Sequence, residues 1–539
     1  MTDSAILSVS KNYKKAVGKL TCLNNEIDAS EPFSILNGAD EQVTGSGFFI
    51  RCKDLYLPKK MAKNRYMITN AHVVEGCSTR RINISFPHLG DTTLWGEVIV
   101  ACRSLDFAIV EVSAEKNTHL ELEIGQTFAD VFKTIPYVKV SSKPVNTNLE
   151  LAKSVIAIGY PHDSHDCHIS SGKLSGKHEH YLQVNASING GNSGGPLFDE
   201  TGICIGICAA SFEDSEGITL AVEWHNVNKM LKHYWNKDQF VIDPPNLGII
   251  GTKLIDAYAV TKLRDTTIKG ALVTQSFSGG PLTQVKEGDV IMAIGDHKHE
   301  YDIDRSGNLT IPYQHDKVKY YSLNLLMLLD PDTCFIRVYS KGRRRTYNFK
   351  LTQLKNTVRR LMPALEPISC ISFGGMIITQ LTKNHMENLE DADIDPNIIN
   401  FFTRTHGGEP AIVISSFHVP CSVLQQGYEI KKLTIIKKIS RKKVTTVKKF
   451  KEIVGLLIDA YIKNKCKKTR YIEMETTNEK IIIDLQLMIK IEPLLLMCPN
   501  YPKKLSVLNM LDCEGDANSD VSDDDDDDER PTKRQKLGM

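Results

Sequence analysis

Short runs of alternating apolar and polar residues recur along the first 240 residues, and glycine, proline, asparagine or aspartate separates most of them. Alternation with a period of two turns one face of a run toward a core, so each run predicts a β-strand. The runs lie at residues 45–50, 65–69, 81–86, 95–101, 106–112, 154–160, 181–188 and 202–210. So many short strands, with no long helical period between them, predict a barrel or a sandwich. Residues 224–235 have the pattern of a helix that closes this region.

A proline-rich break at residues 243–246 ends the first region and predicts a linker. Two later regions share an order of strand, turn, strand, helix and strand, as expected for diverged copies of one unit. The chain ends in a low-complexity segment with an acidic run, Asp523 to Asp528, which we expect to be disordered because like charges repel. The expected domains are therefore residues 1–240, 245–352 and 353–500, followed by a disordered acidic and basic tail at 501–539.

Composition narrows the expected partners and compartment. The chain of 539 residues has a formal net charge of +1, so no overall field favours nucleic acid or a membrane as a partner. No apolar run approaches the roughly 18 residues that a membrane helix needs. The 13 cysteines are an odd number without pairing spacings, and the N-terminus has no secretory pattern. We therefore expect reduced thiols in an intracellular protein, not a secreted one, in the cytoplasm or, given a weak basic signal at 533–536, the nucleus.

The stretch INGGNSGGPLF at residues 188–198 holds one serine, Ser193, among four glycines. A serine hydroxyl attacks a carbonyl only when a base removes its proton, and a histidine oriented by a carboxylate is the usual base. His72 follows the apolar strand 65–69, and Asp106 begins the strand 106–112, where Leu105, Phe107 and Ile109 would shield its carboxylate from water. The order His, Asp, Ser is that of one known triad arrangement.

The glycines beside Ser193 indicate that the backbone itself takes part in the chemistry. Glycine permits tight turns and lets backbone N–H groups come close to a substrate. The N–H groups of Gly191 and Ser193 are the candidate donors of an oxyanion hole, which stabilises the charge of a tetrahedral intermediate. The chemistry needs no cofactor and no metal.

The motifs TNAHVV, DFAIVEV and NASINGGNSGGPLF resemble those of the HtrA/Deg (Do-like) serine proteases, and so does GSGFFI upstream of the histidine. Val73 stands where trypsin-type enzymes have a disulfide cysteine. The later regions resemble the two PDZ domains of plant-type Deg proteases, and the likeness covers roughly residues 13–485. It implies a mainly β protein with a chymotrypsin-like double β-barrel protease domain, two α+β PDZ-like domains and an acidic tail. It also implies a homo-oligomer, a trimer or a multiple of trimers.

Two positions depart from the family pattern. Many relatives have aspartate at the position of Asn185, and proline or serine at that of Gly190. Two adjacent glycines make the loop before Ser193 more flexible, and in this family that loop switches between formed and collapsed oxyanion holes. The resemblance therefore leaves the resting activity as the open question.

The expected substrate is a protein or peptide, cut after a small or medium aliphatic residue. Specificity for basic residues uses an aspartate six positions before the nucleophile, and this chain has Ser187 there. Ile188 beside it is apolar, and Ala209 and Ala210 on the strand 207–211 offer a second wall of the substrate pocket.

The PDZ resemblance implies peptide-binding loops. A PDZ domain captures a C-terminal carboxylate with backbone N–H groups. Leu247, Gly248 and Ile249 form the candidate loop of the first PDZ-like domain, and residues 372–377 form that of the second. The alternative for the second is a structural role in assembly.

Two further segments and the overall function leave alternatives open. The histidine-rich segment 162–181 matches no zinc spacing and is expected to be a solvated loop rather than a metal site. The basic segment 431–451 forms a solvated face, contacts nucleic acid, or docks the acidic tail. The function expected first is an ATP-independent serine endopeptidase for unfolded or regulatory proteins. The alternatives are a chaperone or scaffold that holds misfolded chains through PDZ domains, and a processing protease for one partner.

Overall fold

The computed structural model of the protein describes residues 3–24, 28–33, 41–77, 80–120, 127–161, 164–186, 190–211, 218–277, 279–354, 358–388, 394–398, 410–464, 470–498 and 501–507. The pattern of contacts divides the chain into two compact units. The first holds residues 1–368 with 381–390 and 396–410, and the second holds residues 369–380, 391–395 and 411–539. The acidic run and the basic stretch at 533–536 lie outside the described residues.

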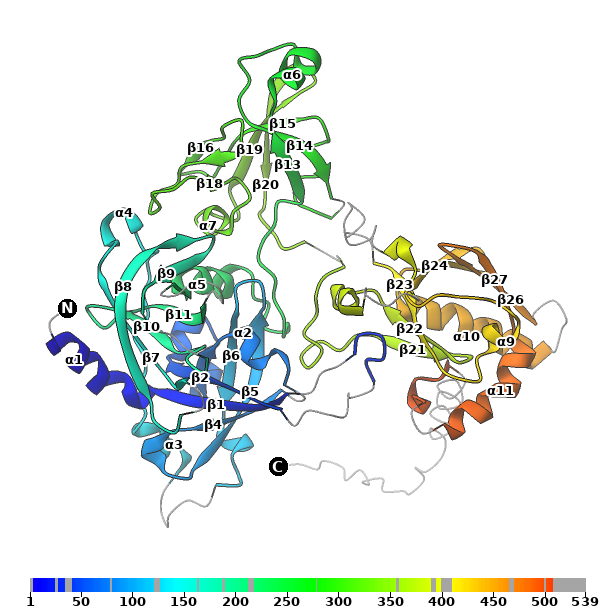
Figure 1. Ribbon diagram of the computed structural model, residues 1–539, viewed down its shortest axis with the longest axis horizontal. Helices are drawn as coiled ribbons and strands as arrows, with labels where there is room; N and C mark the ends of the chain where they lie inside the picture. The colour runs from blue at the N-terminus through cyan, green and yellow to red at the C-terminus, as the bar shows by residue number, and fades with distance from the viewer. Residues whose placement is uncertain are drawn as a thin grey trace, which may run out of the picture. The chain divides into compact units, whose positions relative to one another are not determined.

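Twelve strands of the first unit close into two six-stranded antiparallel barrels, whose strands are drawn in blue to green in Figure 1. The first barrel has the order β1-β2-β3-β6-β5-β4 and the second the order β10-β11-β12-β9-β8-β7. The first contains β1 (Val17–Asn24), β2 (Glu41–Ile50), β3 (Arg65–Thr69), β4 (Arg81–Ser85), β5 (Thr93–Cys102) and β6 (Phe107–Val112). The second contains β7 (Ser154–Gly159), β8 (His168–His178), β9 (Tyr181–Val184), β10 (Pro196–Asp199), β11 (Cys204–Ser211) and β12 (Thr219–Glu223). Two closed barrels are the double-barrel arrangement expected for residues 1–240.

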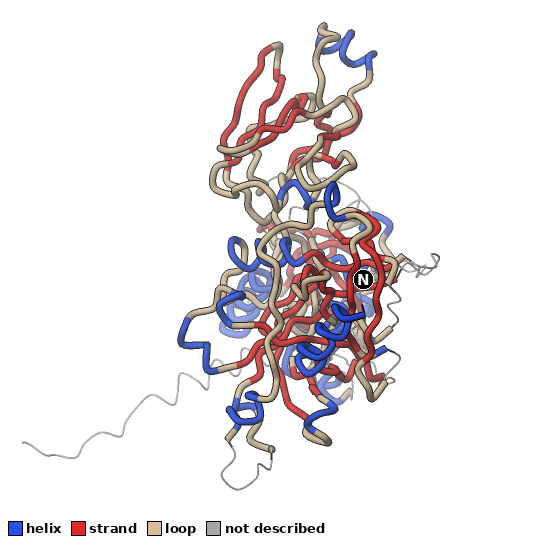
Figure 2. The backbone as a smooth tube through the Cα atoms, turned by 90° about the vertical axis from the view of Figure 1, so that its left-hand side faces the viewer, coloured by secondary structure: helices blue, strands red, loops and turns tan. Residues whose placement is uncertain are grey.

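The helices of this region are short and lie outside the barrels, and Figure 2 shows strands and loops dominating the fold. They are α1 (Asp3–Tyr13), α2 (Ala71–Glu75), α3 (Phe128–Lys133), α4 (Thr147–Glu150) and α5 (Trp224–His233). Helix α5 confirms the closing helix, since it covers most of the predicted range. Its buried residues Trp224, Val227, Met230 and Leu231 follow helical spacing and face the core.

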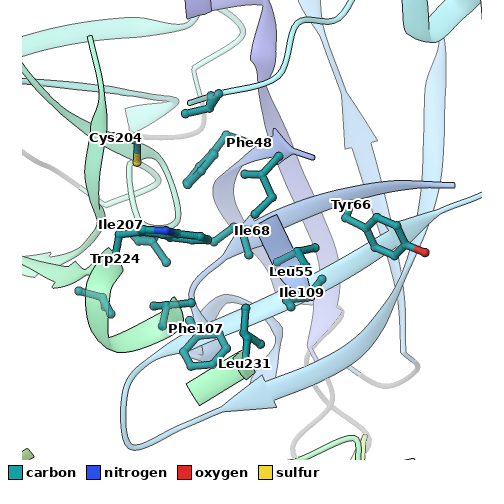
Figure 3. Packing of buried hydrophobic residues seen from close by; sticks show 14 of the residues in the cluster. Phe48, Leu55, Tyr66, Ile68, Phe107, Ile109, Cys204, Ile207, Trp224 and Leu231 are labelled. Atoms are coloured by element: carbon teal, nitrogen blue, oxygen red, sulfur yellow. The ribbon is translucent and has the colours of Figure 1, made fainter. Parts of the chain in front are cut away.

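One apolar cluster joins the two barrels. It combines Phe48 and Ile68 of the first barrel with Ile207 of the second and Trp224 of α5, as Figure 3 shows. These four side chains are at most 1% exposed. Burial of each large apolar side chain contributes roughly 1.5–3 kcal/mol, so this cluster fixes the barrels against each other. The seam between the barrels is therefore rigid enough to hold a site made from both.

The rest of the first unit is a six-stranded sheet of order β13-β14-β15-β19-β20, with β16 paired to β15, and a two-stranded sheet of β17 and β18. Their bounds, with the helices between them, are β13 (Ile249–Lys253), α6 (Asp256–Tyr258), β14 (Ala271–Ser276), β15 (Val290–Gly295), β16 (Glu300–Asp302), β17 (Asn308–Leu309), β18 (Val318–Lys319), α7 (Leu323–Leu326), β19 (Cys334–Ser340) and β20 (Arg343–Phe349). Strands β19 and β20 form an antiparallel hairpin, paired from Cys334 with Phe349 to Ser340 with Arg343.

The second unit is a seven-stranded sheet of order β21-β22-β23-β24-β26-β27, with β25 paired to β24, packed on two long helices. Its elements are β21 (Cys370–Phe373), β22 (Met376–Gln380), β23 (Ile412–Phe417), α9 (Ser422–Gln425), β24 (Thr434–Ile439), β25 (Lys442–Lys443), α10 (Val447–Asn464), β26 (Tyr471–Thr476), β27 (Lys480–Asp484) and α11 (Leu485–Met497). Among the described helices of the chain, none has the length and apolar character needed to cross a bilayer.

Four of the twelve barrel strands lie outside the apolar runs by which the sequence predicted strands. Strand β8 is the clearest case, because it lies in the histidine-rich segment that was expected to be a solvated loop. Along β8 the residues are exposed or half-buried, apart from Leu174, which is buried. The expectation of a loop is wrong for residues 168–178, since pairing with β7 and β9 holds this polar stretch extended. No group of three or more metal-ligand side chains occurs among the described residues.

Candidate active site

His72 lies on α2, a single helical turn that starts directly after the buried strand β3. Asn70, in extended backbone before the helix, separates the two elements. Its side-chain amide donates a hydrogen bond of 2.7 Å to the backbone oxygen of Asp106. The end of β3, just before the helix that carries His72, is thereby tied to the turn that carries Asp106.

Asp106 occupies a sharp turn just before β6. Its backbone N–H donates to the oxygen of Arg103 at 3.0 Å, and its φ of +49° lies in the left-handed region. Non-glycine residues rarely adopt this region, and such strain is found most often at functional sites. The neighbouring Leu105 and Phe107 are fully buried, as is Ile109, which is the apolar shield that the sequence predicts.

The carboxylate of Asp106 contacts His72 through both oxygens. The distances from Nδ1 of His72 to Oδ1 and Oδ2 are 3.0 and 2.9 Å. The backbone N–H of His72 also donates to Oδ1 at 3.0 Å. Three contacts from one carboxylate fix both the ring and the backbone of the histidine. The ring nitrogen that faces Asp106 carries the proton, which leaves Nε2 as an acceptor.

Two opposing effects act on the pKa of His72. Burial lowers it, whereas the hydrogen bond with Asp106 and the negative charges of Asp106 and Glu75 raise it, and the net pKa lies above the usual value. The ring is nevertheless accessible, since the side chain of His72 is 45% exposed and that of Asp106 is 15% exposed. A histidine that is anchored on one side and open on the other can exchange a proton with a bound molecule.

Ser193 lies in the turn that leads into β10, and backbone bonds tie this turn to β11. The N–H of Gly194 donates to the oxygen of Cys208, and the N–H of Cys208 donates to the oxygen of Gly195, both at 2.8 Å. The hydroxyl of Ser193 donates to the backbone oxygen of Ala209 at 2.5 Å. Within the described residues, this hydroxyl makes no hydrogen bond with His72.

The turn that carries Ser193 lies beside the segment that carries His72. A Cβ added to Gly45 on β2 would lie 2.7 Å from Val73 and 3.3 Å from the oxygen of Ser193. One residue of the first barrel therefore lies next to both segments, and Val73 directly follows His72. The structure joins His72 and Asp106 directly and brings the backbone of Ser193 to their side, with its hydroxyl turned toward β11.

The backbone of the loop has the conformation that its glycines permit. Gly191 has a φ of +92° and Gly194 a φ of +90°, both in the left-handed region. The N–H groups of Gly191 and Ser193 donate to no other described residue. Gly190, where many relatives have proline or serine, lies beside open space, because a Cβ added there would meet nothing within 4 Å.

The predicted substrate pocket is described only in part. Ser187 and Ile188 lie outside the described residues. Ala209 is 2% exposed on β11, and Ala210 continues the same strand. Asn185, the other departure from the family pattern, accepts a hydrogen bond from the backbone N–H of Lys173 at 2.5 Å and so fixes the backbone of β8.

The loop predicted to bind peptide, Leu247 to Ile249, lies at the start of β13. Leu247 and Ile249 are buried, and Gly248 has a φ of +70°. The N–H of Gly248 donates to the side chain of Asn246 at 2.8 Å, so it is already occupied. A Cβ on Gly248 would lie 2.7 Å from the Cα of Gly280, which explains the glycine by close approach of two backbones.

The corresponding loop of the second unit is packed against its own chain. The oxygens of Gly374 and Gly375 accept backbone hydrogen bonds from Ser422 and His418 at 2.9 and 2.7 Å. A Cβ on Gly375 would lie 2.7 Å from the oxygen of Pro420. The segment 418–422 therefore contacts the position that a peptide would approach.

The sequence did not single out Ser46, whose hydroxyl, N–H and oxygen all contact the site. Ser46 lies on β2 on the same face as Phe48, and both are completely buried. A polar residue on the buried face of an apolar strand is the signal that would have found it, because such a group is normally held by specific hydrogen bonds.

Residues 45–207, which include His72, Asp106 and Ser193, match the family model of the trypsin-like peptidase domain. The serine protease HhoB of Synechocystis is 28% identical over 265 residues, which cover 47% of this chain and 57% of the relative. A DegP-like periplasmic serine endoprotease of Buchnera aphidicola is 28% identical over 238 residues, covering 43% and 47%. The Do-like protease 14 of Arabidopsis thaliana is 30% identical over 223 residues, covering 35% and 51%.

The chain spans about half the length of the curated relatives it matches. Among solved structures, a serine endoprotease from Yersinia pestis aligns with 65% of this chain and 98% of its own, at 19% identity and a TM-score of 0.40. This low score adds nothing to the fold, which rests on the strand pairing.

The relatives contradict one expectation from the sequence, that of an intracellular protein that is not secreted. The relative from Buchnera is described as periplasmic. The expectation was wrong because it relied on unpaired cysteines as a sign of the compartment. Most of the described cysteines are buried, and burial shelters a thiol from oxidants in any compartment.

The relatives confirm the resemblance that the motifs around the three residues indicate. HhoB, the DegP-like protein and the Do-like protease are all described as proteases, and each matches through a part of the chain rather than the whole. Residues 45–207 therefore match a trypsin-like peptidase domain, and this part of the chain is similar to serine proteases of the HtrA/Deg (Do-like) type.

Proposed function

We propose that the protein is a serine endopeptidase of the HtrA/Deg type, with Ser193 as nucleophile, His72 as general base and Asp106 as the group that orients His72. The oxygen of Ser193 attacks the carbonyl carbon of a peptide bond, and its proton passes to Nε2 of His72. His72 then returns the proton to the leaving nitrogen as the C–N bond breaks. Water repeats the two steps on the ester and frees Ser193.

The observation that carries this proposal is the contact of both Asp106 oxygens with Nδ1 of His72, at 3.0 and 2.9 Å. It holds the imidazole in the tautomer whose Nε2 accepts a proton. It also stabilises the imidazolium that forms during attack, which agrees with the raised pKa of His72. A histidine kept only for packing would not need an aspartate with a strained backbone on its inner side.

The oxyanion of the tetrahedral intermediate would bind to the N–H groups of Gly191 and Ser193. Both groups lack a partner among the described residues, so a ligand oxygen would satisfy them. Donors that are fixed before the reaction stabilise the transition state without reorganisation.

The attack requires one rotation, because the Ser193 hydroxyl donates to Ala209 at 2.5 Å in this structure. Turning about χ1 frees the hydroxyl and directs it toward His72. An extended substrate strand whose N–H groups bind to β11 would compete for the oxygen of Ala209. Substrate binding would thereby release the nucleophile.

We propose protein or peptide substrates cut after small or medium aliphatic residues, since the buried Ala209 makes the pocket wall apolar. The PDZ-like units would bind substrate C-termini or join subunits in a trimer or a multiple of trimers. Every group in the proposed reaction is a protein group or water, so the endopeptidase would work without ATP.

The test compares the wild-type protein with Ser193→Ala on an unfolded model protein. We expect cleavage by the wild type alone, with cut sites after aliphatic residues when the fragments are sequenced. Equal cleavage by both proteins would refute the role of Ser193. Cuts mainly after lysine or arginine would refute the proposed pocket but leave the triad intact.

A second candidate function is a chaperone or scaffold that holds misfolded chains. The observation that favours it is the Ser193 hydroxyl bound to Ala209 instead of His72. In the same experiment, a chaperone would suppress aggregation of the unfolded protein in both the wild type and Ser193→Ala, without cleavage by either.

A further inference from the structure

Ser46 joins the first barrel to the loop that carries Ser193. Its backbone N–H donates to the oxygen of Ser193 and its hydroxyl to the oxygen of Gly191, both at 2.7 Å. The hydroxyl accepts the N–H of Tyr160 at 2.9 Å, and the oxygen of Ser46 accepts the hydroxyl of Thr69 at 2.8 Å. Four hydrogen bonds therefore meet at one fully buried residue.

The direction of the Ser46 hydroxyl follows from this arrangement. A serine hydroxyl has a single proton to donate. The hydroxyl oxygen of Ser46 accepts the N–H of Tyr160. The hydroxyl proton of Ser46 is therefore directed to the oxygen of Gly191. Ser46 and Tyr160 are 0% and 1% exposed, so water does not replace the bond between them.

The bonds to the loop hold three consecutive peptide planes. The Ser46 hydroxyl holds the plane between Gly191 and Asn192. The N–H of Gly195 holds the next plane through the oxygen of Asn192 at 3.0 Å, and the Ser46 N–H holds the plane after Ser193. Because a peptide unit is planar, holding its carbonyl also fixes its N–H. The N–H of Ser193 is therefore fixed in its present direction.

The N–H of Gly191 belongs to the preceding peptide plane, between Gly190 and Gly191, which no such bond among the described residues holds. Neither residue has a side chain, and the Cβ position of Gly190 is in open space. The bond from the Ser46 hydroxyl to the oxygen of Gly191 lies in the adjoining plane, between Gly191 and Asn192, and is the fixed point nearest to this N–H. If it is lost, the glycine pair can rotate and turn the N–H of Gly191 away from the oxyanion.

We propose that Ser46 is a positioning residue, whose hydroxyl holds the N–H of Gly191 in the oxyanion hole. The inference rests on the proposed endopeptidase function. It predicts that Ser46→Ala loses transition-state stabilisation while retaining substrate binding. Loss of one oxyanion donor costs on the order of 100- to 1,000-fold in kcat. Since Ser46 acts through the loop, we expect a loss of roughly tenfold or more in kcat at a nearly unchanged KM.

The experiment measures kcat and KM on a peptide ester, together with the affinity for a peptide boronate. The boronate forms a tetrahedral adduct with the serine and so reports the oxyanion hole. Thr476→Val is the control, since Thr476 in the other compact unit is also buried, and its hydroxyl likewise donates to a backbone oxygen and accepts a backbone N–H, both of Glu479. We expect Ser46→Ala to lose boronate affinity in proportion to kcat, and Thr476→Val to lose neither.

Ser46→Cys keeps the size of the side chain and a weak donor, so it is the second variant if Ser46→Ala does not fold. We expect its kcat to lie between those of the wild type and Ser46→Ala. Boronate affinity and kcat within about twofold of the wild type in both variants would overturn the role of Ser46, because a lost oxyanion donor costs far more. An inactive wild type would instead overturn the proposed function, so the two failures are distinguishable.

Discussion

Replacing Asp106 by asparagine tests the proposed mechanism most directly. The amide oxygen of asparagine can still accept the backbone N–H of His72, which Oδ1 of Asp106 accepts at 3.0 Å. The amide NH₂ group would then face Nδ1 of His72, where the second carboxylate oxygen lies at 2.9 Å. A donor at this position forces the proton of the imidazole onto Nε2. In this tautomer His72 cannot accept the proton of Ser193.

Two contributions set the expected loss of activity. A charge-assisted hydrogen bond stabilises by roughly 1.5–3 kcal/mol, and we take about 1–2 kcal/mol here because the His72 side chain is 45% exposed. This alone corresponds to a loss of roughly five- to thirtyfold. The wrong tautomer adds the larger share, and in a triad of this kind the total reaches on the order of 10⁴-fold in kcat.

The same variant changes the pH dependence. Only neutral His72 is a base, so activity falls as the pH drops through its pKa, which Asp106 raises above the usual 6.5. In Asp106→Asn the lowering effect of burial remains without this opposition, so the acid limb of kcat/KM moves to lower pH. The pair also stabilises the folded protein. That contribution is complete below about pH 6.5 and is lost as the pH rises through the raised pKa of His72.

The assay is kcat/KM for a peptide ester between pH 5 and 9, in the wild type and Asp106→Asn. Asp332→Asn is the matched control, because Asp332 pairs at 2.9 Å with Lys350 on an exposed surface. We expect wild-type activity from the control. An Asp106→Asn protein that keeps its activity within about tenfold, with an unmoved acid limb, would refute the role of Asp106.

The remaining predictions concern the loop and the second barrel. Gly190→Ala places a methyl group where nothing lies within 4 Å, so we expect roughly 0.4–1 kcal/mol of added stability in urea unfolding and an equal or higher kcat. A lower kcat would show that the activity depends on the flexibility of the loop at Gly190. Glu223→Gln leaves the Lys177 ammonium unpaired where the two side chains are 3% and 6% exposed, and we expect a loss of roughly 3–5 kcal/mol in urea unfolding. Glu115→Gln, which breaks an exposed pair, should change stability by less than about 1 kcal/mol.

The elements with compact apolar runs were the ones that the sequence predicted well. Strands β3, β6 and β7 lie where their apolar runs do, because nearly every residue of each is buried and the run needs no distant partner to reveal it. Strand β8 was missed since its exposed side chains carry no alternation, and its extended form depends on the strands beside it.

The sequence by itself determined the mainly β first region, the order of His72, Asp106 and Ser193, and the glycines of the loop, since alternation and turn chemistry are local. Only the tertiary structure decided the contact of Asp106 with His72 across 34 residues of chain and that of Ser46 with Gly191 across 145. It also decided that the Ser193 hydroxyl faces Ala209. These contacts depend on how two closed barrels pack against each other, and a local pattern of residues does not encode which side chains meet at such a seam.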